Sequence, residues 1–230
     1  MKVIILKDKK QASSKVEKIV SDLVKKNPSA VLGLATGKTM IPLYKNLIKQ
    51  NLDFSKVKTF NLDEYVGLKT TNRKSFHYFM NKHLFSKINI NKKNIHFPGA
   101  NFKKYEKEIK KEKIDLQILG IGRNGHIGFN EPGSSFKSIT RKVRLTKNTT
   151  FVNKLFGMSP KYAFTMGIKT ITSSKKIILV AFGNKKADAI SKALEGKINE
   201  EIPASILRKH KDVTFVLDKD AASKLKNKKT

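Results

Sequence analysis

The sequence has no cysteine, few acidic residues and only short apolar runs. Without cysteine the chain can form neither disulfides nor thiolate nucleophiles, a composition that suits the reducing cytoplasm. Residues 1–7 form too short an apolar run for a signal peptide or a membrane span, and they read as a first strand. We therefore expect a cytoplasmic protein without a membrane segment.

Acidic side chains number 18 against 49 lysines and arginines, which gives a formal net charge of +31. Only five of the 49 are arginine, and the lysines are spread along the whole chain. A nucleic-acid site usually concentrates basic groups and aromatics on one face, so this distribution favours solvated lysine faces and no specific nucleic-acid partner. A field this positive would still attract small anionic substrates.

The length of 230 residues, 39% of them hydrophobic, is enough for one substantial core. We expect one domain over residues 1–230 with a frayed polar tail at 224–230. Apolar spacing predicts helices over residues 11–26, 40–48 and 102–113. Short apolar runs predict strands over residues 1–7, 30–35, 57–62, 114–119, 162–168, 175–182 and 213–217, several of them typical of a buried parallel sheet.

A glycine-punctuated loop follows the expected strand at 114–119. Its four glycines, which allow positive φ and close approach of the backbone, are Gly120, Gly122, Gly125 and Gly128. His126 lies among them, between Asn124 and Glu131. Histidine moves protons near neutral pH, and a carboxylate within reach would fix its tautomer. The pattern indicates an acid/base relay.

Other interpretations of this loop stay open on spacing alone. A structural histidine in an ordinary turn is about as good an explanation. A dinucleotide loop fits poorly, because His126 and Phe129 crowd the place of the phosphate. One histidine without cysteine gives little support to a zinc site. We expect no metal at this loop.

A possible anion site precedes the expected helix at 40–48. Thr36, Gly37, Lys38 and Thr39 join that helix to the strand at 30–35, so unpaired amides and the positive helix end point at the loop. The spacing of a nucleotide P-loop is absent, which favours a sugar phosphate over ATP; an ordinary strand-to-helix turn is the alternative. Residues 177–187 repeat the pattern, and Lys186 at the helix entrance offers a second phosphate contact.

Two adjacent acids, Asp63 and Glu64, follow the strand at 57–62. Open parallel sheets bind ligands beyond the carboxyl ends of their strands. Adjacent residues of an extended segment point to opposite faces, so one of the two acids is expected to face the cleft. A helix cap or a pair to a nearby lysine is the alternative.

Taken together, these segments resemble the glucosamine-6-phosphate deaminase (glucosamine-6-phosphate isomerase) family from the first strand to about Leu225. The motifs are LGLATG at 32–37, TFNLDEYVGL at 59–68 and GRNGHIGFNEP at 122–132, supported by PKYA at 160–163 and PAS at 203–205. The resemblance implies a Rossmann-like α/β fold, a three-layer sandwich with a mostly parallel central sheet. It also implies conversion of glucosamine 6-phosphate and water to fructose 6-phosphate and ammonia, without a cofactor.

The resemblance also implies roles for the residues already noted. His126 matches the group that opens the pyranose ring, taking the O1 proton and delivering one to O5, with Asn124 and Glu131 as its orienting partners. Asp63 matches the base that removes the C2 proton and returns a proton to C1. Residues 36–39 and Lys186 match the phosphate site.

This sequence departs from the family in three places. Members often carry a phosphate-binding arginine in the segment corresponding to residues 153–156, where this chain offers only Lys154, a point charge in place of a bidentate fork. Some members have an acid at the position of Asn124. Hexameric members activated by N-acetylglucosamine 6-phosphate use basic residues after the central loop and a longer C-terminus. Arg141 is present, but Val143 replaces an expected lysine, so we expect little or no activation.

Two rival functions remain from the sequence, and the choice between monomer and homo-oligomer stays open. A 6-phosphogluconolactonase shares a glycine-histidine loop, but hydrolysis of a lactone requires no base matching Asp63. A non-catalytic sugar-phosphate regulator would normally carry a helix-turn-helix segment, for which this chain has no spare length.

Overall fold

The computed structural model describes residues 1–146 and 160–226. Its centre is a seven-stranded sheet in which every neighbouring pair of strands is parallel. In spatial order the strands are β1 (Lys2–Leu6), β10 (Val213–Asp218), β9 (Lys176–Ala181), β6 (Leu116–Leu119), β2 (Val31–Leu34), β3 (Lys58–Asn61) and β5 (Ile95–His96).

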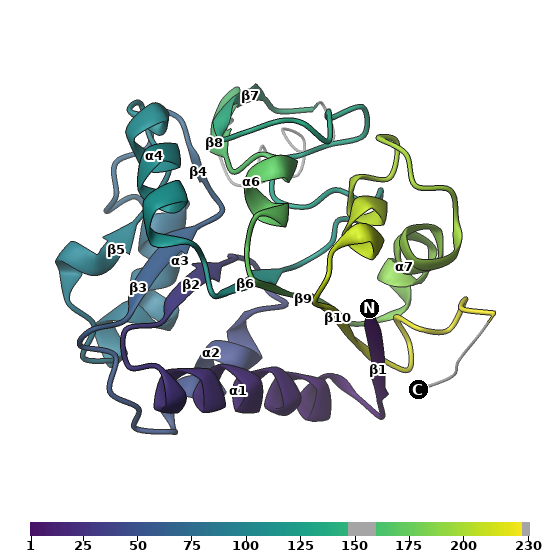
Figure 1. Ribbon diagram of the computed structural model, residues 1–230, viewed down its shortest axis with the longest axis horizontal. Coiled ribbons are helices and arrows are strands. Elements are labelled where there is room, and N and C mark those ends of the chain that lie inside the picture. The colour runs from purple at the N-terminus through teal and green to yellow at the C-terminus, as the bar shows by residue number, and fades with distance from the viewer. Residues whose placement is uncertain (147–159, 227–230) are drawn as a thin grey trace.

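Helices cover both faces of this sheet. Figure 1 shows α1 (Lys9–Lys26) and α2 (Ile41–Ile48) below the sheet and α4 (Phe102–Glu112) and α6 (Ile168–Thr172) above it. The other helical elements are α3 (Phe76–His83), α7 (Ala187–Glu195), η1 (Phe85–Lys87), η2 (Lys92–Asn94), η3 (Asn184–Lys186) and η4 (Pro203–Lys209). The fold is the expected Rossmann-like α/β sandwich.

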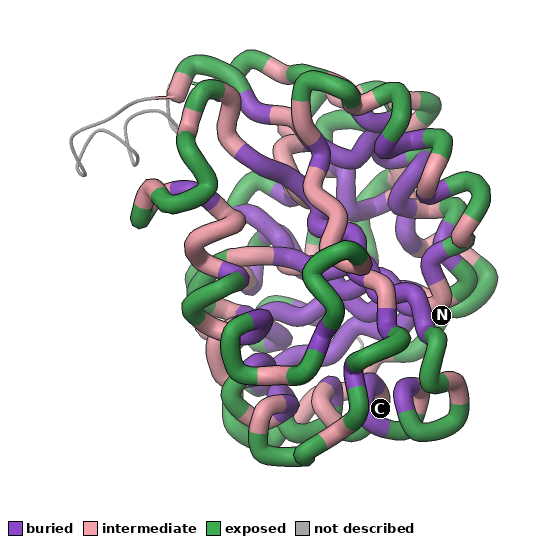
Figure 2. The backbone as a smooth tube through the Cα atoms, turned by 90° about the vertical axis from the view of Figure 1, so that its left-hand side faces the viewer, coloured by how far each residue is buried: buried purple, intermediate pink, exposed green. Residues whose placement is uncertain are grey.

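The core lies between the sheet and its helices. Every residue of β2, β6 and β10 is buried, and Figure 2 shows the buried segments inside a rim of exposed ones. The longest helix, α1, is capped at its N-terminus by Asp8, whose carboxylate accepts hydrogen bonds from the amides of Lys10 and Gln11. Its buried stripe recurs every four residues, at Ala12, Val16, Val20 and Val24. This spacing places one face of the helix on the sheet and its lysines in solvent.

The order of the strands creates a switch point between β2 and β6. From β2 the chain continues outward through β3 and β5, then returns to the other side of β2 with β6 and continues through β9 and β10. The connections that leave β2 and β6 therefore run to opposite sides of a shared crevice. In open α/β sheets this crevice, at the carboxyl ends of the strands, is the usual ligand site.

A second sheet of three antiparallel strands stands at that edge. It contains β4 (Asp63–Tyr65), β8 (Tyr162–Thr165) and β7 (Arg141–Arg144). The chain changes sheets at Leu62, whose amide donates to Leu34 O in the main sheet while its carbonyl accepts from Met166 N. Asp63 and Glu64 thus lie in a strand of their own rather than at the bare end of β3.

One expectation about an element was wrong, and the tail expected to be frayed is described only as far as Lys226. The strand predicted over residues 162–168 ends at Thr165, and α6 begins at Ile168. The frayed tail predicted from 224 is packed as far as Lys226: Leu225 is buried, Lys224 Nζ lies 2.6 Å from Asp188 Oδ1, and Lys226 N donates to Glu195. Within the described residues, no helix combines the length and apolar content needed to cross a bilayer.

Candidate active site

The candidate site lies at the carboxyl ends of four neighbouring strands: β3, β2, β6 and β9. The segments that leave these ends carry, in the same order, Asp63, residues 36–39, the loop with His126, and Lys186. The fold therefore brings the described candidates to one edge of the sheet, beside the switch point.

Two glycines set the position of the His126 ring. A Cβ added at Gly122 would lie 2.2 Å from the imidazole Cε1, so the ring rests against a backbone that has room only for hydrogen. Gly122 N donates to His126 O at 2.9 Å, and Gly125 N donates to Gly122 O at 3.1 Å. Gly125 has φ of 86°, a left-handed conformation that side chains disfavour, and it closes the turn.

A relay of three side chains fixes the histidine tautomer. His126 Nδ1 lies 2.7 Å from Asn124 Oδ1 and 3.3 Å from Glu131 Oε2, both acceptors. Asn124 Nδ2 in turn donates to Glu131 Oε2 at 2.7 Å. Nδ1 therefore carries the proton, and Nε2 is the nitrogen with a free lone pair. The ring is ready to accept a proton at Nε2, with the Glu131 carboxylate close enough to stabilise the imidazolium.

Asp63 occupies a different electrostatic environment. It is 8% exposed, and no hydrogen bond from a described residue reaches its carboxylate. Burial, and next the negative charge of Glu64, raise the pKa of Asp63 to about 8. A carboxyl group poised near neutral pH can exchange a proton with carbon, and perturbed groups of this kind cluster at functional sites.

The neighbouring acid, Glu64, serves the structure. Its carboxylate accepts from the amides of Phe76 and His77, at 3.0 and 2.9 Å, and so caps the N-terminus of α3. It also lies 2.6 Å from His77 Nδ1 and accepts from Tyr65 N. With these contacts Glu64 matches the helix-cap alternative, which leaves Asp63 as the acid available to the site.

Thr165 and Met166 join Asp63 to the histidine loop. Thr165 is the strand partner of Asp63, and its Oγ1 accepts from Phe129 N at 3.1 Å. At Gly128, where φ is 57°, an added Cβ would lie 3.0 Å from Thr165 Oγ1 and 3.7 Å from Asp63 Oδ2. The loop that carries His126 therefore runs directly past the Asp63 carboxylate.

A buried asparagine strengthens this junction. Asn130, fully buried, donates to Ile127 O at 2.9 Å and to Met166 O at 2.8 Å, and its Oδ1 accepts from Arg141 Nη1. Sequence reasoning missed the roles of Thr165 and Asn130. Asn130 stood inside a motif that could have drawn attention to it, whereas nothing in the local pattern around Thr165 distinguishes it from a core strand residue.

The predicted phosphate loop lies between β2 and α2. Gly37 has φ of 103° and Lys38 is exposed, while Thr36 and Thr39 are partly buried. The helix has no side-chain cap, so its first amides are not satisfied from within the loop. An added Cβ at Gly120 would lie 3.5 Å from Met40 Cε, so residues 36–40 lie next to the start of the β6 loop.

Lys186 lies next to the same loop from the other side. Its Nζ donates to Ile121 O at 2.6 Å, and burial, with a smaller effect of Arg123, lowers its pKa. In the part of the chain that the structure describes, this half-buried ammonium contacts only a neutral carbonyl, so it is suited to bind an anionic ligand. Lys154, the other predicted phosphate contact, lies outside the described residues. Within residues 1–146 and 160–226, no group of three acidic or histidine side chains could hold a metal ion.

This geometry defines a class of protein: an α/β fold whose switch-point crevice combines an imidazole relay, a poised carboxyl group and a basic loop. The chain belongs to the family of glucosamine-6-phosphate isomerases and 6-phosphogluconolactonases, whose model matches residues 8–216. Among curated relatives, a glucosamine-6-phosphate deaminase of Clostridium novyi (strain NT) is 51% identical, over 98% of this chain and 100% of that protein. A deaminase of Clostridium botulinum (strain Langeland) is 49% identical, over 99% and 100%.

Solved structures give the same result for the fold. A monomeric glucosamine-6-phosphate deaminase superposes with a TM-score of 0.93 at 43% identity, covering 97% of this chain and 100% of that one. A 6-phosphogluconolactonase from Leishmania guyanensis has a TM-score of 0.77 at 19% identity, covering 96% and 97%. The second likeness shows a shared fold and nothing more.

Proposed function

We propose that this protein converts glucosamine 6-phosphate and water to fructose 6-phosphate and ammonia. The observation that carries the proposal is the junction at Thr165, which holds the Asp63 carboxyl group beside the loop of the His126 relay. Aldose-ketose isomerisation needs two separate proton-transfer groups on one substrate, and this junction supplies them. The names of the relatives at about 50% identity support the same substrate.

Ring opening falls to His126. Its Nε2 accepts the proton of the O1 hydroxyl, and the imidazolium then donates a proton to O5 as the C1–O5 bond breaks. Nδ1 keeps its proton throughout and donates it in a hydrogen bond to Asn124 Oδ1. The Glu131 carboxylate, 3.3 Å from Nδ1, stabilises the transient positive charge on the ring. The product of this step is the open-chain aldehyde.

Isomerisation and deamination fall to Asp63. Its carboxylate removes the C2 proton while a proton passes from the substrate ammonium to O1, which gives the neutral enolamine. The Asp63 carboxyl group then delivers its proton to C1, which leaves a protonated imine at C2. Water adds to that protonated imine, and ammonia leaves as the ketone forms. In the free protein the raised pKa of Asp63 favours its protonated form. The positive amino group of the bound substrate then shifts Asp63 toward the carboxylate, which is the form that acts as the base.

The phosphate end is proposed to bind between residues 36–39 and Lys186, with Lys154 in place of the arginine of other members. The loop amides, the N-terminus of α2 and one half-buried ammonium converge on the β6 loop from two sides. We further propose a cytoplasmic role in N-acetylglucosamine breakdown, without a cofactor, a specific nucleic-acid partner or a membrane. The monomeric relative supports a monomer.

The test is incubation of the purified protein with glucosamine 6-phosphate, with ammonia and fructose 6-phosphate both measured. Equal amounts of the two products are expected. A parallel incubation with 6-phosphogluconolactone, followed by acid release, covers the lactonase function. Lactone hydrolysis without ammonia production would overturn the proposal, and the absence of both activities would favour a non-catalytic regulator.

A further inference from the structure

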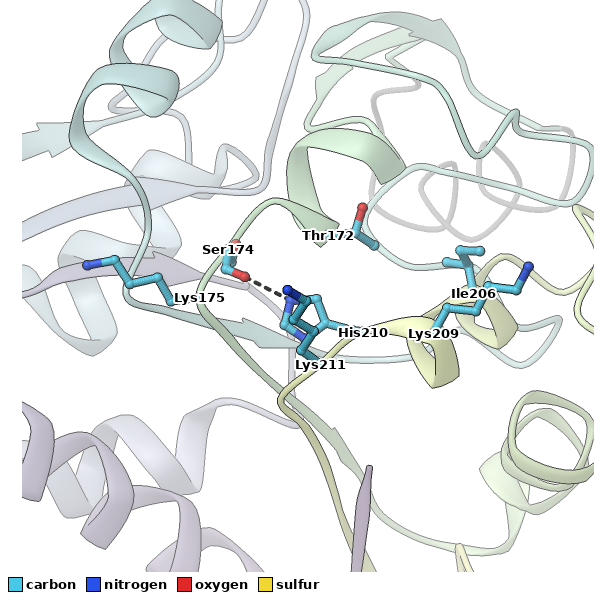
Figure 3. A pocket seen from close by; sticks show the side chains of 7 residues that line it. All are labelled: Thr172, Ser174, Lys175, Ile206, Lys209, His210 and Lys211. Atoms are coloured by element: carbon cyan, nitrogen blue, oxygen red, sulfur yellow. Dashed lines mark hydrogen bonds between the residues drawn. The ribbon is translucent and has the colours of Figure 1, made fainter.

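A cavity of about 470 Å³ lies at the opposite end of the sheet from the candidate active site. Its walls are the segments that lead into β9 and β10, with Ser174 and Lys175 on one side and Ile206, Lys209, His210 and Lys211 on the other (Figure 3). The six residues of β9 separate the two sites by roughly 20 Å, at about 3.3 Å per residue.

His210 ties the two walls together. Its Nε2 donates to Ser174 O at 2.8 Å, and its Nδ1 accepts from Asp212 N at 3.1 Å. A carbonyl can only accept and an amide can only donate, so both ring nitrogens are used in hydrogen bonds that fix the orientation of the ring. The cavity is therefore preformed, and His210 is part of its frame.

The charge around the cavity has one sign. No carboxylate lines it. Lys175 Nζ pairs with Asp115 at 2.7 Å, and in Figure 3 its side chain points away from the other lining residues. Lys209 and Lys211 are exposed, and neither makes an ion pair within the described residues. Two ammonium groups thus remain available to an anion.

Ser174 supplies the observation that points to a ligand. It is 4% exposed, and its hydroxyl has no hydrogen-bond partner among residues 1–146 and 160–226. The hydroxyl of the neighbouring Thr172, in contrast, donates within α6 to Ile168 O. An unsatisfied buried hydroxyl is unfavourable, and a ligand oxygen in this cavity would satisfy it after rotation about χ1.

We propose that this cavity is a binding site for a small phosphorylated anion, separate from the active site. The phosphoryl oxygens accept from Lys211 and the Ser174 hydroxyl, and the side chains of Ile206 and Lys209, which lie together across the cavity in Figure 3, contact the rest of the ligand. The volume falls in the range of small-molecule sites. Lys175 immediately precedes β9 and Lys186 follows its end, so the segments at the two ends of this strand line the cavity and the candidate active site.

The test uses backbone amide chemical shifts, because they separate the two sites. Sodium phosphate is titrated into the ¹⁵N-labelled protein against sodium chloride of equal ionic strength. Saturable shifts are expected at the amides of residues 174–175 and 209–212 in phosphate only. Shifts at residues 36–39 and 183–186 would report the active site separately, so failure of either proposal leaves the other readable.

Three variants make the test specific. Lys209→Ala/Lys211→Ala is expected to weaken phosphate binding at this site at least about tenfold, since a charge-assisted hydrogen bond is worth about one order of magnitude in affinity. Lys107→Ala/Lys110→Ala removes the same charge from the exposed face of α4 and should leave binding unchanged. Ser174→Ala should weaken binding without lowering Tm, because the free hydroxyl makes no hydrogen bond.

Two outcomes overturn the proposal. One is the absence of a phosphate-specific, saturable shift at residues 174–175 and 209–212. The other is an equal loss of affinity in the two double-lysine variants, which would show a response to net charge rather than a site.

Discussion

Asp63 shows how one residue is adapted to chemistry at the expense of stability. Its burial and the nearby Glu64 both disfavour the carboxylate, yet the proposed C2 step requires that form. His126 has the opposite arrangement, since two acceptors at Nδ1 support its charged form. The two groups thus lie in different surroundings within one site, Asp63 without and His126 with polar side-chain partners among the described residues.

Substitution of either group is expected to abolish most turnover. Asp63→Asn and His126→Gln should each lower kcat for ammonia release at least about a hundredfold, because a positioned acid/base group typically contributes that much. Circular dichroism should show an intact fold. Asp53→Asn and His83→Gln, which change the same residue types outside the site, serve as controls. Near-normal turnover in either site variant would remove that residue from the mechanism.

The raised pKa of Asp63 also predicts how stability depends on pH. An unfolded aspartate titrates near 3.9, whereas the folded group titrates at about 8. The folded state holds the proton more tightly, so the contribution of Asp63 to stability is present below pH ~4 and lost as pH rises through ~8.

The Asp63→Asn variant does not lose stability in this way, because the asparagine side chain stays neutral at every pH. In urea unfolding, the variant should be more stable than wild type by more than about 2 kcal/mol at pH 8, and the difference should shrink toward pH 4–5. A difference that is constant with pH, or that reverses in sign, would show that Asp63 is ionised in the free protein.

At the scale of elements, the small antiparallel sheet does the positioning. β8 pairs with β4 on one side and with β7 on the other, and the hydroxyl of its Thr165 accepts a hydrogen bond from Phe129 N. Met166 adds two backbone contacts, accepting from Asn130 and donating to Leu62 O. The distance between Asp63 and the histidine loop therefore depends on the end of a strand a hundred residues away from Asp63.

Thr165 offers a direct test of this dependence. Thr165→Val keeps the shape of the side chain but removes the acceptor for Phe129 N, so the loop that carries His126 should shift. We expect kcat to fall about tenfold or more, since the proton-transfer groups are misplaced. KM should stay within about twofold, because the proposed phosphate site is separate. Thr165→Ser loses a buried methyl group but keeps the hydroxyl, so it should lose stability yet retain most of kcat. Equal kcat in the two variants, at matched fractions folded, would show that Thr165 has only a packing role.

The same junction marks the limit of prediction from sequence. The loop after β6 and its residues could be identified, since glycine spacing and histidine chemistry are local signals. That Asp63 belongs to a second sheet could not, because its strand partner is set by tertiary pairing. Residues 162–168 continue an apolar pattern through Gly167, but a Cβ there would lie 2.3 Å from Ser138 O, and this distant contact accompanies the end of the strand.

At the scale of the whole molecule, the reversal of strand order gathers segments spread over more than 120 residues at one edge. Asp63 and Lys186 approach the β6 loop from opposite sides, through β3 and β9. The described candidates of the proposed site are therefore neighbours within the fold of a single chain.

Val143, in place of the lysine expected in members activated by N-acetylglucosamine 6-phosphate, predicts simple kinetics. The rate of ammonia release should depend hyperbolically on glucosamine 6-phosphate, and N-acetylglucosamine 6-phosphate should leave the curve unchanged apart from any competition. Initial rates across the substrate range, with and without that compound, provide the measurement. A sigmoidal curve made hyperbolic by the addition would contradict the expectation.

The net charge of +31 predicts that salt acts on substrate capture rather than on chemistry. Lysines spread over the surface create a positive potential that concentrates a phosphorylated substrate, and that potential is screened within about 10 Å at 0.1 M salt. The buried Asp63 and the direct contacts of His126 are screened far less. Raising sodium chloride from about 20 to 300 mM should therefore lower kcat/KM several-fold and leave kcat nearly constant.

Sodium acetate at the same ionic strength should act alike, since screening does not depend on the anion. If kcat/KM stays constant, the lysines do not aid substrate capture and serve only as a solvated surface; if kcat falls in parallel, salt acts on the site itself.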